Sequence, residues 1–133
     1  MLFVVGGCGF LGSGDSPENK PDGFPLHGYV SVAGASAGTV GSPCLAPPKV
    51  TDIVAGGKVL ISDPAGKNLA TGKLGTGVLA ADGSTYRCNF PFQVPGVPGG
   101  QATYVIVVGI QPAASFPASE LRADKPAVIQ VGA

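Results

Sequence analysis

The sequence predicts an all-β protein built as an antiparallel two-sheet sandwich of six to seven strands. Two observations support this fold class. Short apolar or alternating segments recur along the chain, and 22 glycines and 13 prolines supply turn signals between them. No segment has the long apolar periodicity of an amphipathic helix. Short strands separated by turns are typical of two packed sheets.

The first predicted strand spans residues 24–33, where Leu26, Gly28, Val30 and Val32 share one face. A loop of small residues then covers 34–48. Residues 50–54 are expected to form a short strand or an edge segment.

Residues 58–62 and 69–74 predict a hairpin. Residues 63–68 separate them, and there Pro64 fixes φ and Gly66 permits a positive φ. The next segment, 75–82, has no clear pattern and ends near a further turn signal.

Residues 86–94 show the clearest alternation, with Cys88, Phe90 and Phe92 on the face expected to fill the core. Pro91 lacks a backbone donor, which predicts an edge position or a local irregularity. Three further elements are expected: a central strand at 103–110 covered on both faces, one helical turn at 115–121 and a last strand at 127–131.

Composition excludes several classes of function. The eight basic and eight acidic residues cancel and form no run of like charge. Nucleic acid and anionic lipid surfaces both require clustered Lys and Arg, so neither is an expected partner. No Cys/His cluster or closely spaced set of acids indicates a metal site, and we expect no cofactor.

The N-terminus contains a candidate lipidation motif. In Val5-Gly6-Gly7-Cys8 an aliphatic residue and two small residues precede a cysteine, the order that bacterial lipoproteins use to attach diacylglycerol. Only seven residues precede Cys8 and none is basic, so residues 1–8 are interpreted as the remnant of a longer signal peptide. Residues 9–23 are then a flexible linker, and 24–133 form the sandwich domain.

Two other interpretations of this segment remain. Gly7, Gly9 and Gly12 fit the G-x-G-x-x-G pattern of NAD(P)-binding enzymes. That pattern requires a helix after the glycines, whereas residues 13–23 contain two prolines and no apolar periodicity. The other alternative is a disordered apolar tail.

The chain has three cysteines, and an odd number in an exported protein requires an explanation for one of them. Lipidation of Cys8 leaves Cys44 and Cys88 as a disulfide pair. The alternative is two buried free thiols in a cytosolic protein.

No catalytic set is evident. His27 is the only histidine, and no nucleophile motif accompanies it. Asp52 and Asp63 are candidates for paired carboxylates, but Asp63 begins a turn in which Asp is favoured for local hydrogen bonding. We therefore expect a protein that is not an enzyme.

Several motifs together resemble small secreted lipoproteins of actinobacteria, mostly of unassigned function. They include Thr51-Asp52-Ile53, Gly57-Lys58-Val59 and the segment 88–94, and the resemblance covers roughly residues 26–131. The segment 59–74 also resembles a hairpin of transthyretin-like and immunoglobulin-like sandwiches. The resemblance implies an immunoglobulin-like fold and export rather than a particular chemistry.

The expected function is accordingly that of a cell-envelope lipoprotein. Its lipid on Cys8 would hold it at the membrane, outside the cytoplasm, and its sandwich would act as a non-catalytic module that binds a protein partner in a membrane or wall assembly. Edge strands and the 34–48 loop are the expected contact surfaces. The alternatives are a carrier of a small apolar ligand between the sheets and, less favoured, the NAD(P)-binding enzyme.

Overall fold

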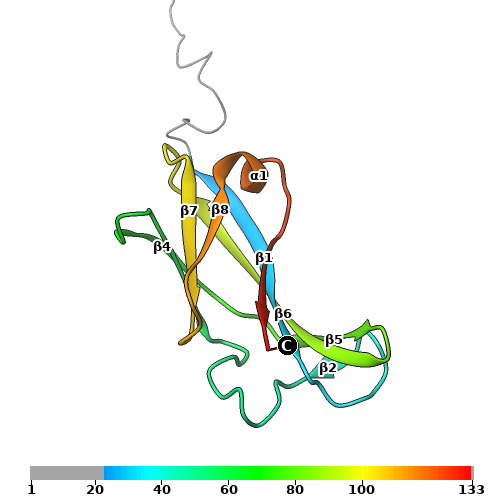
Figure 1. The fold of residues 1–133 in the computed structure, drawn as a ribbon. Coiled ribbons are helices and arrows are strands. Elements are labelled where there is room, and N and C mark those ends of the chain that lie inside the picture. Colours follow the sequence, from blue (N-terminus) through cyan, green and yellow to red (C-terminus); the bar gives the residue numbers. More distant parts are fainter. Residues whose placement is uncertain (1–22, 133) are drawn as a thin grey trace, which may run out of the picture.

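The computed structural model describes residues 23–132, which form two stacked sheets and one short helix (Figure 1). The predicted two-sheet sandwich is confirmed, although the described residues contain nine strands rather than six to seven. The elements are β1 (Phe24–Ala33), β2 (Pro43–Cys44), β3 (Lys58–Ser62), β4 (Asn68–Lys73), β5 (Gly77–Asp82), β6 (Thr85–Val97), β7 (Thr103–Val108), β8 (Ala114–Pro117), α1 (Ala118–Arg122) and β9 (Ala127–Val131).

The strand order is β2-β5-β6-β1-β9 in the five-stranded sheet and β4-β3-β7-β8 in the four-stranded sheet. All neighbouring strands pair antiparallel except β1 and β9, which run parallel. The antiparallel architecture predicted from the sequence therefore holds for every pair but this one. The sheets meet near β4, where Leu74 forms an isolated bridge with Phe92 of β6.

Alternation along β1 and β6 builds one side of the core. Leu26, Val30 and Val32 are buried on β1, as predicted. On β6 the residues Cys88, Phe90, Phe92 and Val94 are buried, and this face packs against the four-stranded sheet. Its side chains fill the space between the two layers.

Pro91 lies in a strand that is interior to its sheet, because β6 has β5 on one side and β1 on the other. The pairing with β5 nevertheless stops at Asn89, two residues earlier. The Pro91 carbonyl accepts instead from the backbone N–H of Gly75. The missing donor thus falls where the sheet has a local edge, which explains how the proline is tolerated.

The four-stranded sheet supplies the other side of the core through Val59, Ile61, Tyr104, Ile106 and Val108. The strand predicted at 103–110 is central, between β3 and β8, but two details were wrong. It ends at Val108, and its residues alternate between buried and half-buried, so only one face is fully covered.

Other expectations also need correction. Residues 50–54 form no strand; Ile53 is fully buried as part of a loop. The helical turn expected at 115–121 begins only at Ala118, and β8 occupies the residues before it. Pro117 favours an extended conformation in the residue that precedes it, which separates the two elements. The unassigned segment 75–82 contains β5.

The sandwich has two distinct ends (Figure 1). β1 starts at Phe24, beside α1, and finishes at Ala33 at the opposite end. We call this opposite end the loop end and define it as residues 34–57 and 109–113. These segments follow β1, precede β3 and connect β7 to β8, and Val59 of β3 pairs with Val108 of β7 there.

Candidate functional site

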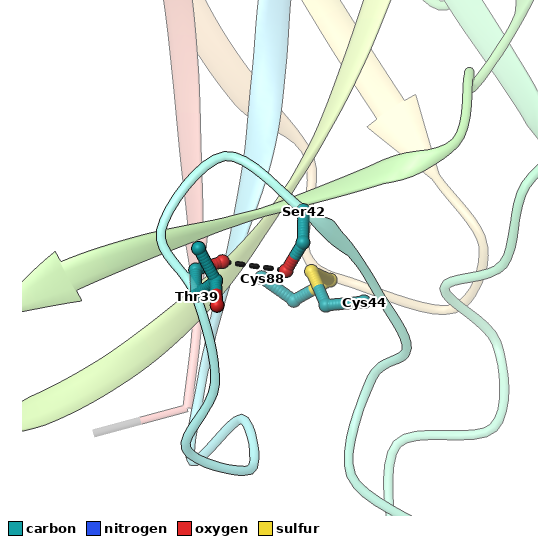
Figure 2. Close-up of a disulfide and its surroundings, with 4 residues drawn as sticks. All are labelled: Thr39, Ser42, Cys44 and Cys88. Atoms are coloured by element: carbon teal, nitrogen blue, oxygen red, sulfur yellow. Dashed lines mark hydrogen bonds between the residues drawn. A yellow bond between two sulfur atoms is a disulfide. The ribbon is translucent and has the colours of Figure 1, made fainter.

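A disulfide joins Cys44 to Cys88 and fixes the first segment of the loop end (Figure 2). The Cα atoms lie 5.8 Å apart. Cys88 is fully buried on β6, whereas Cys44 belongs to the two-residue strand β2. The predicted pairing of these two cysteines is confirmed.

Backbone hydrogen bonds hold the same segment against β5. The N–H of Gly41 donates to the carbonyl of Leu79 over 2.8 Å, and the N–H of Leu79 donates to the carbonyl of Ser42 over 2.9 Å. The Ser42 hydroxyl donates to the Thr39 carbonyl within the turn (Figure 2). The 34–48 loop is thus pinned covalently to β6 and by its backbone to β5.

Gly77 makes room for the disulfide. A Cβ at this position would lie 2.4 Å from Cys88 Sγ and 2.7 Å from the Cys44 carbonyl oxygen. Only glycine fits here without displacing the bridge or β2.

Asp52 braces the second part of the loop end. Its Oδ2 accepts from the backbone N–H of Ile110 at 3.1 Å and from Nε2 of Gln111 at 2.9 Å. One carboxylate therefore links the loop before β3 to the turn between β7 and β8. Asp63 sits beyond the other end of β3, where its Oδ1 accepts from the Lys67 N–H, so Asp52 and Asp63 are not a carboxylate pair.

Truncating Asp52 tests this brace. Asp52→Ala is expected to lower the free energy of unfolding by about 1 kcal/mol, because it removes two hydrogen bonds from a partly exposed site. Hydrogen exchange at the Ile110 amide should become faster. Unchanged exchange at Ile110 would show that the turn is held by other contacts.

The same carboxylate makes a defined contribution to acid stability. Burial raises the pKa of Asp52, but hydrogen bonds from Gln111, Ile110 and its own backbone outweigh burial and place the pKa below its ordinary value of 3.8. Because the folded pKa is the lower one, the ionised form favours folding. This stabilisation is complete above about pH 3.8 and is lost as the pH falls toward the folded pKa.

Urea unfolding of the wild type and Asp52→Asn at several acidic pH values tests whether ionised Asp52 stabilises the fold. The wild type is expected to lose more stability than the variant below about pH 3.8, since the variant has no carboxyl to protonate. If the free energy of unfolding falls equally with pH in the two proteins, the pKa of Asp52 is not lowered by folding.

Large apolar side chains are exposed on this braced framework. Leu45 is 84% exposed and Ile110 is 86% exposed. Val40 and Val54 are also exposed, and Val78 is exposed on β5 opposite Pro43 of β2. Among the described residues, every exposed large hydrophobic residue thus lies on the loop end or directly beside it. A hollow of about 470 Å³ opens next to Leu45 and is lined by Leu79, Pro47 and Pro48.

His27 lies elsewhere, in contact with Asp124. Its Nδ1 is 3.3 Å from Asp124 Oδ1, and Asp124 adopts a positive φ of 69°. His27 lines a hollow of about 400 Å³ whose other lining residues include no Ser, Thr or Cys. His27 thus contacts an exposed carboxylate at the surface.

Within residues 23–132, no group of three or more potential metal ligands is present. No helix in the same range is both long and apolar enough to cross a bilayer. The lipidation candidate Cys8 and the glycine motif at Gly7, Gly9 and Gly12 fall outside the described residues.

Comparison with known proteins found no matching family model, no matching curated protein and no matching solved structure.

The exposure of Ile110 was not predicted from the sequence. Its apolar character extends the run of β7, so pattern alone places it in a strand. The glycine before it, Gly109, has a φ of 55° and begins the turn. This glycine after six β-branched or aromatic residues was the available signal.

Proposed function

We propose that this protein is a non-catalytic binding module of the cell envelope, anchored to the membrane by a lipid on Cys8. The observation that carries the binding role is the collection of exposed apolar side chains on the braced loop end. Isolated apolar residues on a surface are ordinary, but a concentration of them at one end favours an interface.

The disulfide supports an extracytoplasmic location. Disulfides persist in oxidising compartments and are rare in the reducing cytosol. Pairing of Cys44 with Cys88 leaves Cys8 as the third cysteine, and its Val5-Gly6-Gly7 context suits diacylglycerol attachment.

The position of the domain's first strand supports the orientation of the module. β1 begins at Phe24, where the linker from Cys8 reaches the sandwich, and its 10 residues run to the loop end. At about 3.3 Å per residue this strand places the loop end about 33 Å from the linker. The apolar loops therefore lie at the end of the domain that is far from the attachment of the linker.

The chemistry of the loop end indicates a protein partner. Residues 34–57 contain only two charged side chains, Lys49 and Asp52, and Asp52 is engaged with the 110–111 turn. A partner surface that is apolar and largely uncharged would complement it, and rigid loops lose little entropy on binding.

The test compares two variants with similar expected stability. Leu45→Ser with Ile110→Ser removes the two most exposed apolar side chains, and Lys67→Ser changes an exposed residue at the other end of the sandwich. Complexes are isolated from membranes of the native host by size exclusion, and the partner is identified by mass spectrometry. The same partner should co-elute with the wild type and Lys67→Ser and be lost from the double variant. A wild-type protein that elutes only as a monomer would contradict the proposal.

The other two functions receive no support from this geometry. Tyr104, Phe90 and Leu26 fill the space between the sheets, and three surface hollows lie on loops or outer faces. A carrier of apolar ligands would need an internal cavity. Dinucleotide binding by this fingerprint uses a parallel sheet flanked by helices, unlike the sandwich of residues 23–132.

A further inference from the structure

The outer face of the five-stranded sheet carries a polar hollow of about 320 Å³ that the proposed binding role does not use. Residues from β1, β5, β6 and β9 line it, so it is built on rigid strands and not on loops. This volume is at the lower end for small-molecule sites. Its polar lining residues are Tyr29, Ser31, Asp82, Arg87, Asn89 and Gln130.

Strand register places three of these side chains in one row. Ser31 of β1 pairs with Asn89 of β6 on one side and with Gln130 of β9 on the other. Tyr29 lies two residues before Ser31 and therefore on the same face. A hydroxyl, two amides and an aromatic ring thus share a small area.

The positive charge in the hollow is already compensated. Arg87 donates from Nε to Ser31 Oγ at 2.7 Å and from Nη2 to the Ser31 carbonyl at 2.9 Å. Its Nη1 lies 3.5 Å from Asp82 Oδ2. Because the guanidinium and the carboxylate offset one another, the hollow favours a neutral ligand over an anion or a cation.

One acceptor on a residue that lines the hollow has no hydrogen-bond partner. Asn89 Oδ1 is buried, and no described residue donates a hydrogen bond to it. A buried polar atom without a partner destabilises the fold, and such atoms are rare in native proteins. Rotation of the Asn89 amide toward the hollow would let a ligand hydroxyl donate to this oxygen.

We propose that this hollow binds a neutral saccharide. Sugar hydroxyls donate and accept at once, which suits the side-chain amides of Asn89 and Gln130 and the Tyr29 hydroxyl. The C–H face of a sugar ring packs on an aromatic ring, and Tyr29 supplies one among the lining residues. The site is independent of the loop end and of the lipid on Cys8, so it extends the proposed function to a second class of ligand.

The test is an NMR titration of the folded domain with neutral mono- and disaccharides, among them methyl glucoside, N-acetylglucosamine and its dimer, and with the matching uronic acids. Neutral sugars at millimolar concentrations should shift the amides of residues 29–31, 80–82 and 87–89. Absence of shifts with every neutral sugar, or shifts with the uronic acids alone, would overturn the proposal.

Asn89→Leu tests whether Asn89 binds the sugar or only contributes to the stability of the fold. If Asn89 serves a ligand, the variant should bind the sugar about tenfold more weakly or worse, while its Tm equals or exceeds that of the wild type. The matched control is Gln93→Leu, on the same face of β6 and outside the hollow, which should retain affinity. A lower Tm for Asn89→Leu with unchanged affinity would mean that water alone satisfies Asn89, and the proposal would fall.

Asp82→Asn checks the charge argument. This variant leaves Arg87 without its carboxylate, so the hollow should gain affinity for uronic acids while still binding the neutral sugar. If the variant shows the same preference as the wild type, the Arg87–Asp82 pair does not set the ligand's charge and the charge argument is wrong.

Discussion

Replacing both bridging cysteines, as Cys44→Ser with Cys88→Ala, is expected to lower the free energy of unfolding by about 4 kcal/mol. The bridge closes a loop with a sequence separation of 44 residues, and its removal restores conformational entropy to the unfolded chain. The native state also loses a covalent link to β2, which has only two residues and cannot hold the 34–48 loop alone. Urea unfolding at equilibrium measures the difference.

The control is Cys8→Ser, because Cys8 is outside the bridge and outside the described residues. This variant should unfold at the same urea concentration as the wild type. A loss of less than about 1 kcal/mol in the double variant would contradict a stabilising bridge. Thiol titration of the unfolded wild type without reductant gives an independent check, since Cys44 and Cys88 should not react.

Gly28→Ala is expected to cost about 3 kcal/mol, because two backbones approach closely at this residue. Gly28 of β1 pairs with Ala127 of β9, and a Cβ on Gly28 would lie 2.0 Å from the Ala127 carbonyl oxygen. The backbone of Ala127 cannot move aside as easily as the end of a flexible side chain. The parallel pair must part, and Ile129 and Val131 then lose part of their burial.

Gly75→Ala is the matched control. Its added Cβ would meet Pro91 Cγ at an ordinary distance of 3.4 Å, and its φ lies outside the left-handed region. The control should change stability by less than about 1 kcal/mol. Hydrogen exchange should show that Gly28→Ala exposes the amides of β9 first, and equal effects of the two substitutions would contradict the close approach.

The sequence was sufficient to locate strands with clear alternation. The predicted bounds of β1, β3 and β9 agree with the structure to the residue, because each alternating or apolar run is bounded by Gly, Pro or Asp. The face that carries Phe90 and Phe92 was also predicted, since successive side chains in a strand point to opposite sides.

Elements that depend on distant contacts could not be predicted in this way. β2 has no pattern of its own and forms because the bridge and β5 hold it. Apolar residues at 50–54 suggested a strand, but Ile53 reaches the core from a loop. The parallel pairing of β1 with β9 joins the first and the last strand of the described residues. Periodicity within a strand carries no information about such a partner.

In the candidate site, too, some features were predictable from the sequence and others depend on contacts between distant residues. Cysteine count and chemistry alone allowed Cys44 to be paired with Cys88. The brace at Asp52 spans 58 residues to Ile110, and the polar row of Asn89, Ser31 and Gln130 joins three strands far apart in the chain. Both arise from tertiary structure, so they become visible only once the strands are placed.

The central claim is that this sandwich is held at a membrane through Cys8 and exposed to an oxidising compartment. Its most direct test is the intact mass of the protein purified from membranes of its native host, measured before and after reduction and alkylation. The account predicts a chain that starts at Cys8, carries acyl groups, and has two thiols that alkylate only after reduction. A chain that extends N-terminal to an unmodified Cys8, with three thiols free before reduction, would contradict it.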